Sequence, residues 1–233
     1  ATVKLVVVGG GIMGLAAARA AAVAGHAVEL IEQGALPNPL ASSWDHSRLI
    51  RHTYGTKHGY AAMVCDAFAA KAALFAALGA DLYTRTGTLL LVRGEDPDAE
   101  ASRAGLEALD VGHEVLDAEA VAARFPPLVT DGVAWALYTP TGGVLRAAAL
   151  LETLVADLER RANVRLHAHR RVAAIDPAAG RVTATDGART EGDRVLVTAG
   201  PWLADLMADL TEHARPSRQI ALDVEMEPAA RAA

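Results

Sequence analysis

The chain has 233 residues, of which 52% are hydrophobic and 21% are charged, so the composition is that of a globular protein and not of a disordered one. A formal net charge of −6 argues against nucleic-acid binding, and the single cysteine, Cys65, excludes an internal disulfide and a cysteine-based metal site. Glycine, arginine or histidine interrupts each apolar run short of membrane-spanning length, so we expect a cytoplasmic protein that does not bind a membrane.

The first thirty residues predict a strand, a helix and a second strand. Residues 3–10, VKLVVVGG, form a β-branched run typical of a strand buried on both faces. Residues 12–25 are rich in helix formers and end at a glycine, where a helix C-cap is expected. Residues 26–32, HAVELIE, form a second apolar strand. The sequence therefore opens with a βαβ unit.

Farther along the chain, apolar periodicity and turn residues predict both helices and strands. The predicted helices cover residues 58–79, 97–110, 117–124 and 145–162, with another from Pro201 onward. The predicted strands cover residues 86–92, 132–139, two pieces of 164–176, 180–187 and 193–200. Residues 34–43, with two prolines and two serines, are expected to form a loop.

A G-x-G-x-x-G pattern joins the first strand to the first helix. Gly9 permits the tight turn, Gly11 lets a pyrophosphate approach the backbone, and Gly14 lets helix and strand pack closely. The helix N-terminus offers free N–H donors to phosphate oxygens. Glu32, at the end of the second strand, is placed to accept the ribose hydroxyls of an adenosine and would repel a 2′-phosphate. The pattern predicts a dinucleotide site that disfavours NADP, and it does not separate FAD from NAD.

Two arginines lie close together in SSWDHSRLIRHTYG, residues 42–55. Arg48 and Arg51 flank the apolar pair Leu49-Ile50. Taken alone, the pair is as compatible with salt bridges on a surface helix, with Asp45 as a partner, as with an anion site.

Together these stretches resemble the sarcosine oxidase family of flavin-dependent amine oxidases, within the D-amino-acid-oxidase-like group. The resemblance rests on the glycine turn and on five further segments. These are SRLIRHTYG (47–55), TGTLLLV (86–92), YTPTGGVL (138–145), VLVTAGPW (195–202) and RQI (218–220).

The resemblance implies an α/β fold: a Rossmann-like FAD/NAD(P)-binding domain with a parallel sheet and helices, plus part of an antiparallel-sheet substrate domain. The expected FAD-binding domain is discontinuous, with residues 1–83 and 143–214. Residues 84–142 and 215–233 would form the partial substrate domain.

The resemblance also implies the cofactor, the reaction and the residues that serve them. FAD would oxidise the C–N bond of an amino acid or N-alkyl amino acid to an imine, and dioxygen would then yield hydrogen peroxide. Arg48 would lie close to the isoalloxazine ring and Arg51 would bind the substrate carboxylate. The expected cofactor-binding residues are Gly9, Gly11, Ile12, Met13, Gly14, Glu32, Gln33, Ser42, Ser43, Ser47, Arg48, Val172, Ala199, Gly200 and Trp202.

Two departures from the family pattern limit this expectation. Trp44 stands where close relatives carry a histidine beside the flavin, which predicts a different or bulkier substrate. Family members also continue well past the length of this chain, with more of the substrate-binding sheet and a lysine that assists oxygen. An NAD-linked dehydrogenase and a non-catalytic dinucleotide-binding fragment therefore remain as alternatives, and a companion chain would supply the second half.

The histidines and the cysteine are expected to be structural. His46, His52 and His58 recur every six residues, which fits no metal-ligand spacing, so no metal site is expected. His167 and His169 are expected to share one face of a strand. Cys65 is expected to be a buried core thiol.

Overall fold

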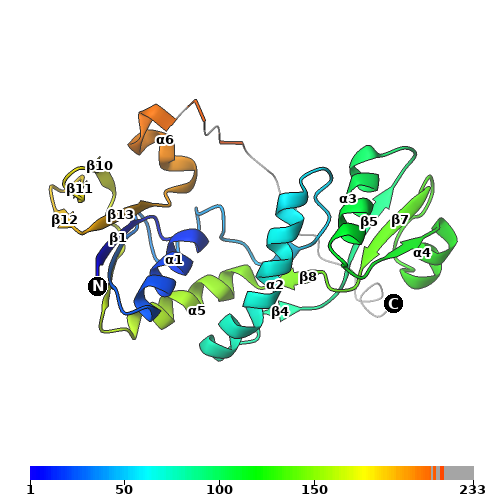
Figure 1. Ribbon diagram of the computed structural model, residues 1–233, viewed down its shortest axis with the longest axis horizontal. Helices are drawn as coiled ribbons and strands as arrows, with labels where there is room; N and C mark the ends of the chain where they lie inside the picture. Colours follow the sequence, from blue (N-terminus) through cyan, green and yellow to red (C-terminus); the bar gives the residue numbers. More distant parts are fainter. Residues whose placement is uncertain (211, 214–215, 218–233) are drawn as a thin grey trace. The chain divides into compact units, whose positions relative to one another are not determined.

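The structure of the chain, a computed structural model, describes residues 1–210, 212–213 and 216–217. Among these residues the chain forms two compact units (Figure 1). The first contains Ala1–Ser47 and the described residues from Arg146 onward, and the second contains Arg48–Leu145.

The first unit is built on a parallel sheet with strand order β13-β1-β2-β9. Strands β1 and β2 are in register from Lys4 opposite Ala27 to Val8 opposite Ile31. The β-branched residues of β1 lie at the middle of this sheet, where both faces are covered, as the continuous apolar run predicts. The elements of this unit are β1 (Lys4–Val8), α1 (Ile12–Val23), β2 (Ala27–Ile31), α5 (Ala147–Glu159), β9 (Val164–His167), β10 (Val172–Asp176), β11 (Arg181–Ala184), β12 (Arg189–Glu191), β13 (Arg194–Val197), η1 (Gly200–Trp202), α6 (Leu203–Leu206) and η2 (Ala208–Leu210).

A small antiparallel sheet, β10-β11-β12, packs beside the parallel sheet. Val172 and Val182 from the small sheet join Val6, Val8 and Ile31 from the parallel sheet in one buried hydrophobic cluster. The parallel sheet and the antiparallel sheets confirm the predicted α/β fold class. His169 lies beyond the end of β9 in a left-handed conformation with φ 55°, so the expectation that it shares a strand face with His167 was wrong.

Helices α1 and α5 lie side by side, and a charged cluster joins them (Figure 1). The carboxylate of Asp157, on α5, lies 3.2 Å from Arg19 Nε on α1 and 2.8 Å from Arg161 Nε. Asp157 is 7% exposed. Burial alone raises the pKa of Asp157, but the hydrogen bond and charge of Arg161, together with Arg19, outweigh burial and hold this pKa below its ordinary value.

We expect Asp157→Asn to lower the free energy of unfolding by about 1–3 kcal/mol at neutral pH, because the ion pair with Arg19 of α1 is lost and the hydrogen bonds from Arg161 lose their charge assistance. The native pKa is depressed, so the stabilisation is present above the unfolded-state pKa and is lost as pH falls through the native pKa, below 3.8. Urea unfolding of both proteins should show a difference at about pH 6 that shrinks by about pH 3. An equal difference at both pH values would contradict this assignment.

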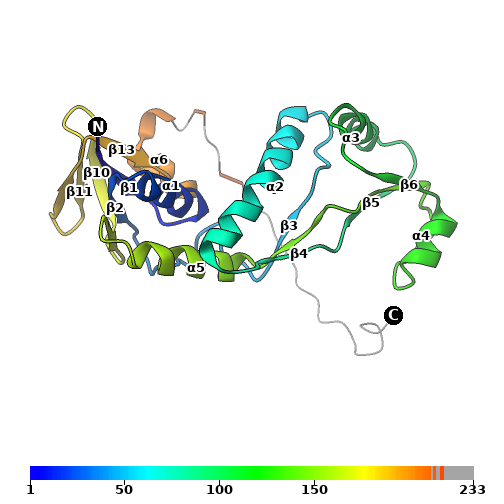
Figure 2. The ribbon, with the colours of Figure 1, turned by 60° about the horizontal axis from the view of Figure 1, so that its bottom comes forward.

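The second unit contains two three-stranded antiparallel sheets. Their strand orders are β3-β8-β4 and β5-β7-β6, and α3 and α4 lie on either side of the latter (Figure 2). Arg48 lies opposite Leu145 across the β3–β8 pair. The elements of this unit are β3 (Arg48–Ile50), α2 (His58–Leu78), β4 (Tyr83–Thr84), β5 (Thr88–Val92), α3 (Pro97–Ala108), β6 (Glu114–Leu116), α4 (Ala118–Arg124), β7 (Trp135–Thr139) and β8 (Gly143–Leu145).

This division differs from the domain boundaries expected from the sequence. Residues 48–83, expected in the FAD-binding domain, cluster with the second unit, because β3 and β4 both pair with β8. The expectation for residues 215 and 218–233, which includes the RQI segment, lies outside the described residues.

Helix α2 is apolar and largely exposed within its unit. Its length and composition would allow it to cross a membrane, and 6% of its most apolar window is buried. The expectation that every apolar run falls short of membrane-spanning length was therefore wrong for this helix. A single helix of this kind does not identify a membrane protein, because core helices of water-soluble proteins have the same length and composition.

Candidate functional site

The glycine turn between β1 and α1 is closed by direct backbone contacts. Gly9 has φ 107°, and a Cβ there would collide with the carbonyl of Thr198. A Cβ at Gly14 would collide with the carbonyl of Gly9 and lie 2.8 Å from Thr198 Oγ1. Neither position accommodates a side chain without moving backbone, so both glycines serve the close packing of α1 on the sheet.

Gly11, by contrast, borders open space. The nearest atom to a Cβ at this position would be Ser43 Oγ at 3.4 Å, an ordinary van der Waals distance. Ser43 Oγ accepts a hydrogen bond from Ile12 N–H at 3.1 Å, at the start of α1. The side chain of Met13 is 71% exposed. The first turn of α1 thus presents accessible backbone N–H donors and the positive end of a helix dipole, the chemistry that binds phosphate oxygens.

Glu32 lies at the end of β2 with its carboxylate buried beside the turn. Its Oε2 accepts from Gly10 N–H at 2.7 Å, and its Oε1 accepts from Gly34 N–H at 2.9 Å and Asn38 Nδ2 at 2.8 Å. Glu32 is 5% exposed and Asn38 is 4% exposed. A carboxylate accepts about four hydrogen bonds. The described residues donate three to Glu32, so its carboxylate can accept one more from a ligand hydroxyl. Asn38 was not predicted from the sequence, although Asn is a common loop-stabilising residue.

We expect Glu32→Gln to destabilise the first unit by about 1–3 kcal/mol. The amide replaces one acceptor oxygen by a donor, which must then face Gly10 N–H or Asn38 Nδ2 in a buried place. Denaturant unfolding measures this loss, and Glu152→Gln, the same change at an exposed position of α5, is the matched control. Unchanged stability in Glu32→Gln would show that the three hydrogen bonds do not hold the turn.

The end of β13 closes the turn from the other side. Thr198 Oγ1 donates at 3.0 Å to the carbonyls of Val8 and Gly9, and so ties the ends of β1 and β13 together. Thr198 was missed as a site residue, although a polar residue directly after an apolar strand was the available signal. Next in the chain, Gly200 has φ 57° and Trp202 N–H donates to the Ala199 carbonyl at 3.2 Å.

The remaining predicted cofactor residues of the first unit differ in environment. Val172 is 6% exposed and its side chain packs in the core, where only its backbone could serve a ligand. Gln33, directly after Glu32, is half-buried. Ser42 and Ser47, on the stretch between β2 and β3, are exposed. The structure thus brings Gly11, Ile12, Ser43 and Glu32 together around one turn.

Arg48 and Arg51 belong to the second unit, and Arg48 begins a strand, not a surface helix. Arg48 lies in β3 and is exposed. Arg51 follows the strand, and its guanidinium carbon lies 5.4 Å from the centroid of the Tyr54 ring, within cation–π range. These two arginines are therefore three residues apart on an extended segment that ends in a turn.

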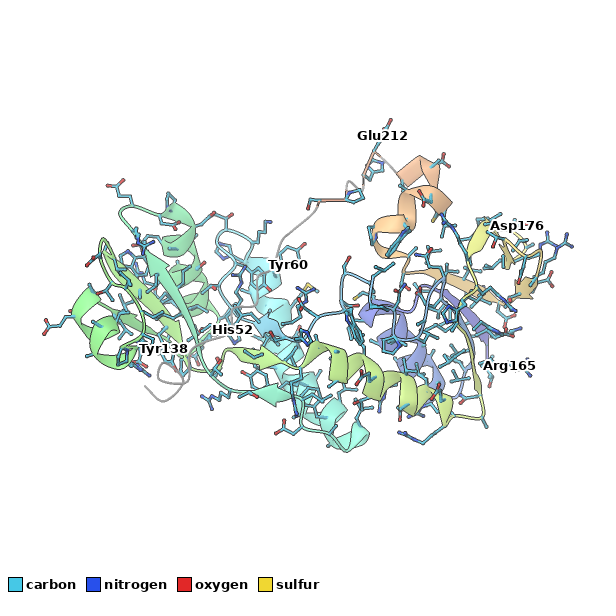
Figure 3. The ribbon with its side chains drawn as sticks, turned by 180° about the vertical axis from the view of Figure 1, so that it is seen from behind. His52, Tyr60, Tyr138, Arg165, Asp176 and Glu212 are labelled. Atoms are coloured by element: carbon cyan, nitrogen blue, oxygen red, sulfur yellow. The ribbon has the colours of Figure 1, made fainter. Side chains whose placement is uncertain are left out.

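His52, the next residue, is buried and anchors the segment (Figure 3). Its ring stacks on Phe68 with centroids 4.9 Å apart, and Thr141 Oγ1 lies 3.2 Å from its Nε2. Cys65 Sγ lies 3.8 Å from Nδ1, and this thiol is half-exposed, so its expected full burial was wrong. Burial lowers the pKa of His52, because desolvation disfavours the charged imidazolium.

A dinucleotide fits the geometry of the first unit. The backbone at Gly11 is open to a phosphate, the helix dipole favours its charge, and a buried acid lies at the end of the neighbouring strand. In the described residues no group of three or more His, Cys, Asp or Glu side chains could hold a metal ion.

Comparison with known proteins identifies the family. The family model described as FAD dependent oxidoreductase matches residues 4–233. The chain belongs to this family. Its members use FAD, and the relatives include oxidases of amino acids and N-methyl amino acids.

Individual relatives cover the chain almost completely. Human peroxisomal sarcosine oxidase is 29% identical over 205 residues, which is 88% of this chain and 52% of that protein. N-methyl-L-tryptophan oxidase of Yersinia pestis is 27% identical over 207 residues, 88% of this chain and 56% of that protein. The chain therefore spans about half the length of the curated relatives that it matches.

Solved structures agree with this assignment. NikD, titled an unusual amino acid oxidase essential for nikkomycin biosynthesis, matches with TM-score 0.74 and 25% identity, covering 90% of this chain and 54% of NikD. Glycine oxidase from Geobacillus kaustophilus matches with TM-score 0.76 and 21% identity, covering 89% of this chain and 58% of that one, which shows the shared fold.

Proposed function

We propose that the chain binds FAD and takes part in oxidising the C–N bond of an amino acid or N-alkyl amino acid. The observation that carries the proposal is the open backbone at Gly11, at the start of α1, beside the buried carboxylate of Glu32. Membership of an FAD dependent oxidoreductase family supports FAD rather than NAD as the dinucleotide.

The residues of the first unit would hold the ADP half of the cofactor. The backbone of Gly11, Ile12 and Met13 would bind a pyrophosphate, with the Ile12 N–H exchanging its hydrogen bond to Ser43 Oγ for one to a phosphate oxygen. Glu32 would accept from a ribose hydroxyl. Gly14, Gln33, the three serines Ser42, Ser43 and Ser47, and the strand-end residues Val172, Ala199, Gly200 and Trp202 complete the proposed binding set. When bound, FAD supplies the two-electron acceptor for the substrate.

The arginines of the second unit would serve the ring and the substrate. A guanidinium matches a carboxylate with two parallel hydrogen bonds, so Arg51 would anchor the acid group of the substrate. Arg48 would place positive charge close to the flavin, where it favours the reduced, anionic form. Positive charge also lowers the pKa of the substrate amine, which must react as the neutral base.

The names of the relatives and the presence of Trp44 support a substrate class for the proposal. Sarcosine oxidase and N-methyl-L-tryptophan oxidase are named for N-methyl amino acids, which supports a secondary amine that carries a carboxylate. Overall, amine, dioxygen and water would yield the carbonyl product, the freed amine and hydrogen peroxide. Trp44, in place of a histidine, favours a substrate other than sarcosine. A cytoplasmic setting is part of the proposal.

A non-catalytic dinucleotide-binding role is the second candidate, because the open backbone at Gly11 and the buried Glu32 both belong to the first unit and would hold a dinucleotide without the two arginines.

Titration of the purified chain with FAD and then with N-methyl amino acids under anaerobic conditions tests the proposal. Bound flavin that bleaches on addition of amine, with peroxide formed when air is admitted, is the expected result. Flavin that binds but is never reduced would favour the second candidate, and binding of NAD alone would contradict the first.

A further inference from the structure

The loop that carries Arg51 is fixed to the rest of the second unit at two points. Gly55 N–H donates to Ser102 Oγ, on α3, at 2.8 Å, and Ser102 is 5% exposed. Gly55 has φ 57°, and a Cβ there would lie 2.8 Å from Asp98 Oδ1, so only glycine suits this turn. His52, on the other side, is buried against Phe68. The backbone around Tyr54 is therefore held in place.

Aromatic rings continue from Arg51 to helix α2. The guanidinium carbon of Arg51 lies 5.4 Å from the centroid of Tyr54. The Tyr54 ring in turn lies 5.8 Å from the ring of Tyr60, at an interplanar angle of 36°. Tyr60 is on the first turn of α2, and Figure 3 shows it and His52 beside this helix. Tyr54 thus connects an exposed cation to a regular element.

This arrangement leaves the hydrogen-bond donors of Arg51 available. A guanidinium carries its N–H groups at the edge of its plane and can contact an aromatic ring without using them. Among the described residues no carboxylate pairs with Arg51, so no acidic side chain there competes for these donors. A free arginine side chain samples many rotamers, and an aromatic neighbour restricts them before a ligand arrives.

We propose that Tyr54 is a positioning residue that holds the Arg51 guanidinium ready for the carboxylate of the substrate. The inference rests on the proposed function, in which Arg51 binds that carboxylate. The aromatic ring, and not the hydroxyl of Tyr54, provides the contact.

Two substitutions separate ring from hydroxyl. In the FAD-loaded chain, Tyr54→Leu should raise KM for an N-methyl amino acid roughly two- to fivefold with kcat unchanged, the size of an exposed cation–π contact. Tyr54→Phe should keep the KM of the wild type. Calorimetry with propanoate, which has no amine to oxidise, should show the same pattern without turnover. Propanamide, which lacks the charge, is the control and should bind all variants equally weakly.

Each other outcome has one meaning. If the wild type and Tyr54→Leu bind propanoate equally while Arg51→Lys binds it more weakly, the inference is wrong and the proposed function stands. If the wild type binds no propanoate, the proposed role of Arg51 is wrong and the inference is wrong with it. Should Tyr54→Leu fail to fold, Tyr54→Trp tests the inference instead. Tryptophan is a stronger cation–π partner than phenylalanine, so the Tyr54→Trp protein should bind propanoate at least as tightly as the Tyr54→Phe protein. Weaker binding by the Tyr54→Trp protein would refute the inference.

Discussion

Gly11→Ala is expected to fold like the wild type and to bind FAD about tenfold to a hundredfold more weakly, a loss of about 1.4–2.7 kcal/mol in binding free energy. The backbone at Gly11 has φ −73° and ψ −178°, which alanine adopts without strain. Ser43 Oγ, at 3.4 Å, is the one atom that would lie within 4 Å of the added methyl carbon among the described residues. It would otherwise project into the space beside the first turn of α1, where the proposed pyrophosphate must approach. Equilibrium titration with FAD measures the loss.

Gly14→Ala is the matched control, because the same methyl group there has a different consequence. Its Cβ would collide with the carbonyl of Gly9, so α1 would have to move away from the sheet and stability would fall. The proposal requires that Gly11→Ala lose affinity at unchanged unfolding midpoint and that Gly14→Ala lose stability. If Gly11→Ala binds FAD as tightly as the wild type, the dinucleotide does not lie over this turn.

The βαβ unit could be predicted from the sequence because its signals are local. The β-branched run of β1, the glycine turn and the glycine after α1 each act within a few residues. Short strands gave no such signal. Strand β3 has three residues and pairs with β8, whose Val144 lies opposite Leu49 far along the chain. Three residues are too few to show a period of two, and partners at such separation leave no local pattern.

In the candidate site, too, the residues of a local motif could be predicted, whereas contacts between distant segments could not. The sequence spacing predicts Glu32, because an acid after the second strand is part of a local motif. Two partners of its carboxylate come from the following loop and the third, Gly10, comes from the glycine turn. Thr198 follows β13, more than a hundred residues away. Which polar groups meet there depends on tertiary packing. Likewise, the burial of His52 depends on Phe68 and Thr141, which its own segment does not reveal.

Arg51→Lys is expected to raise KM for an N-methyl amino acid about tenfold to 150-fold, with a smaller change in kcat. Lysine keeps the charge but loses the planar pair of donors that matches a carboxylate, and a hydrogen bond to a charged group contributes about 1.5–3 kcal/mol. Anaerobic flavin reduction at varied amine concentration separates binding from the rate of reduction. Because the loss is in substrate binding, high amine concentration should restore most of the rate.

Arg103→Lys provides the control for a general effect of arginine loss in the same unit. Arg103 lies on α3 and pairs with Glu100 and Glu107 on an exposed helix face, so its replacement should leave KM unchanged. An amine substrate without a carboxylate adds a second control, since it offers Arg51 nothing to bind and should be oxidised equally by wild type and Arg51→Lys. A similar rise in KM for both classes of amine would mean that Arg51 supports the loop and not the carboxylate. The contrast between the two amines, rather than the size of either effect, therefore decides what the guanidinium recognises.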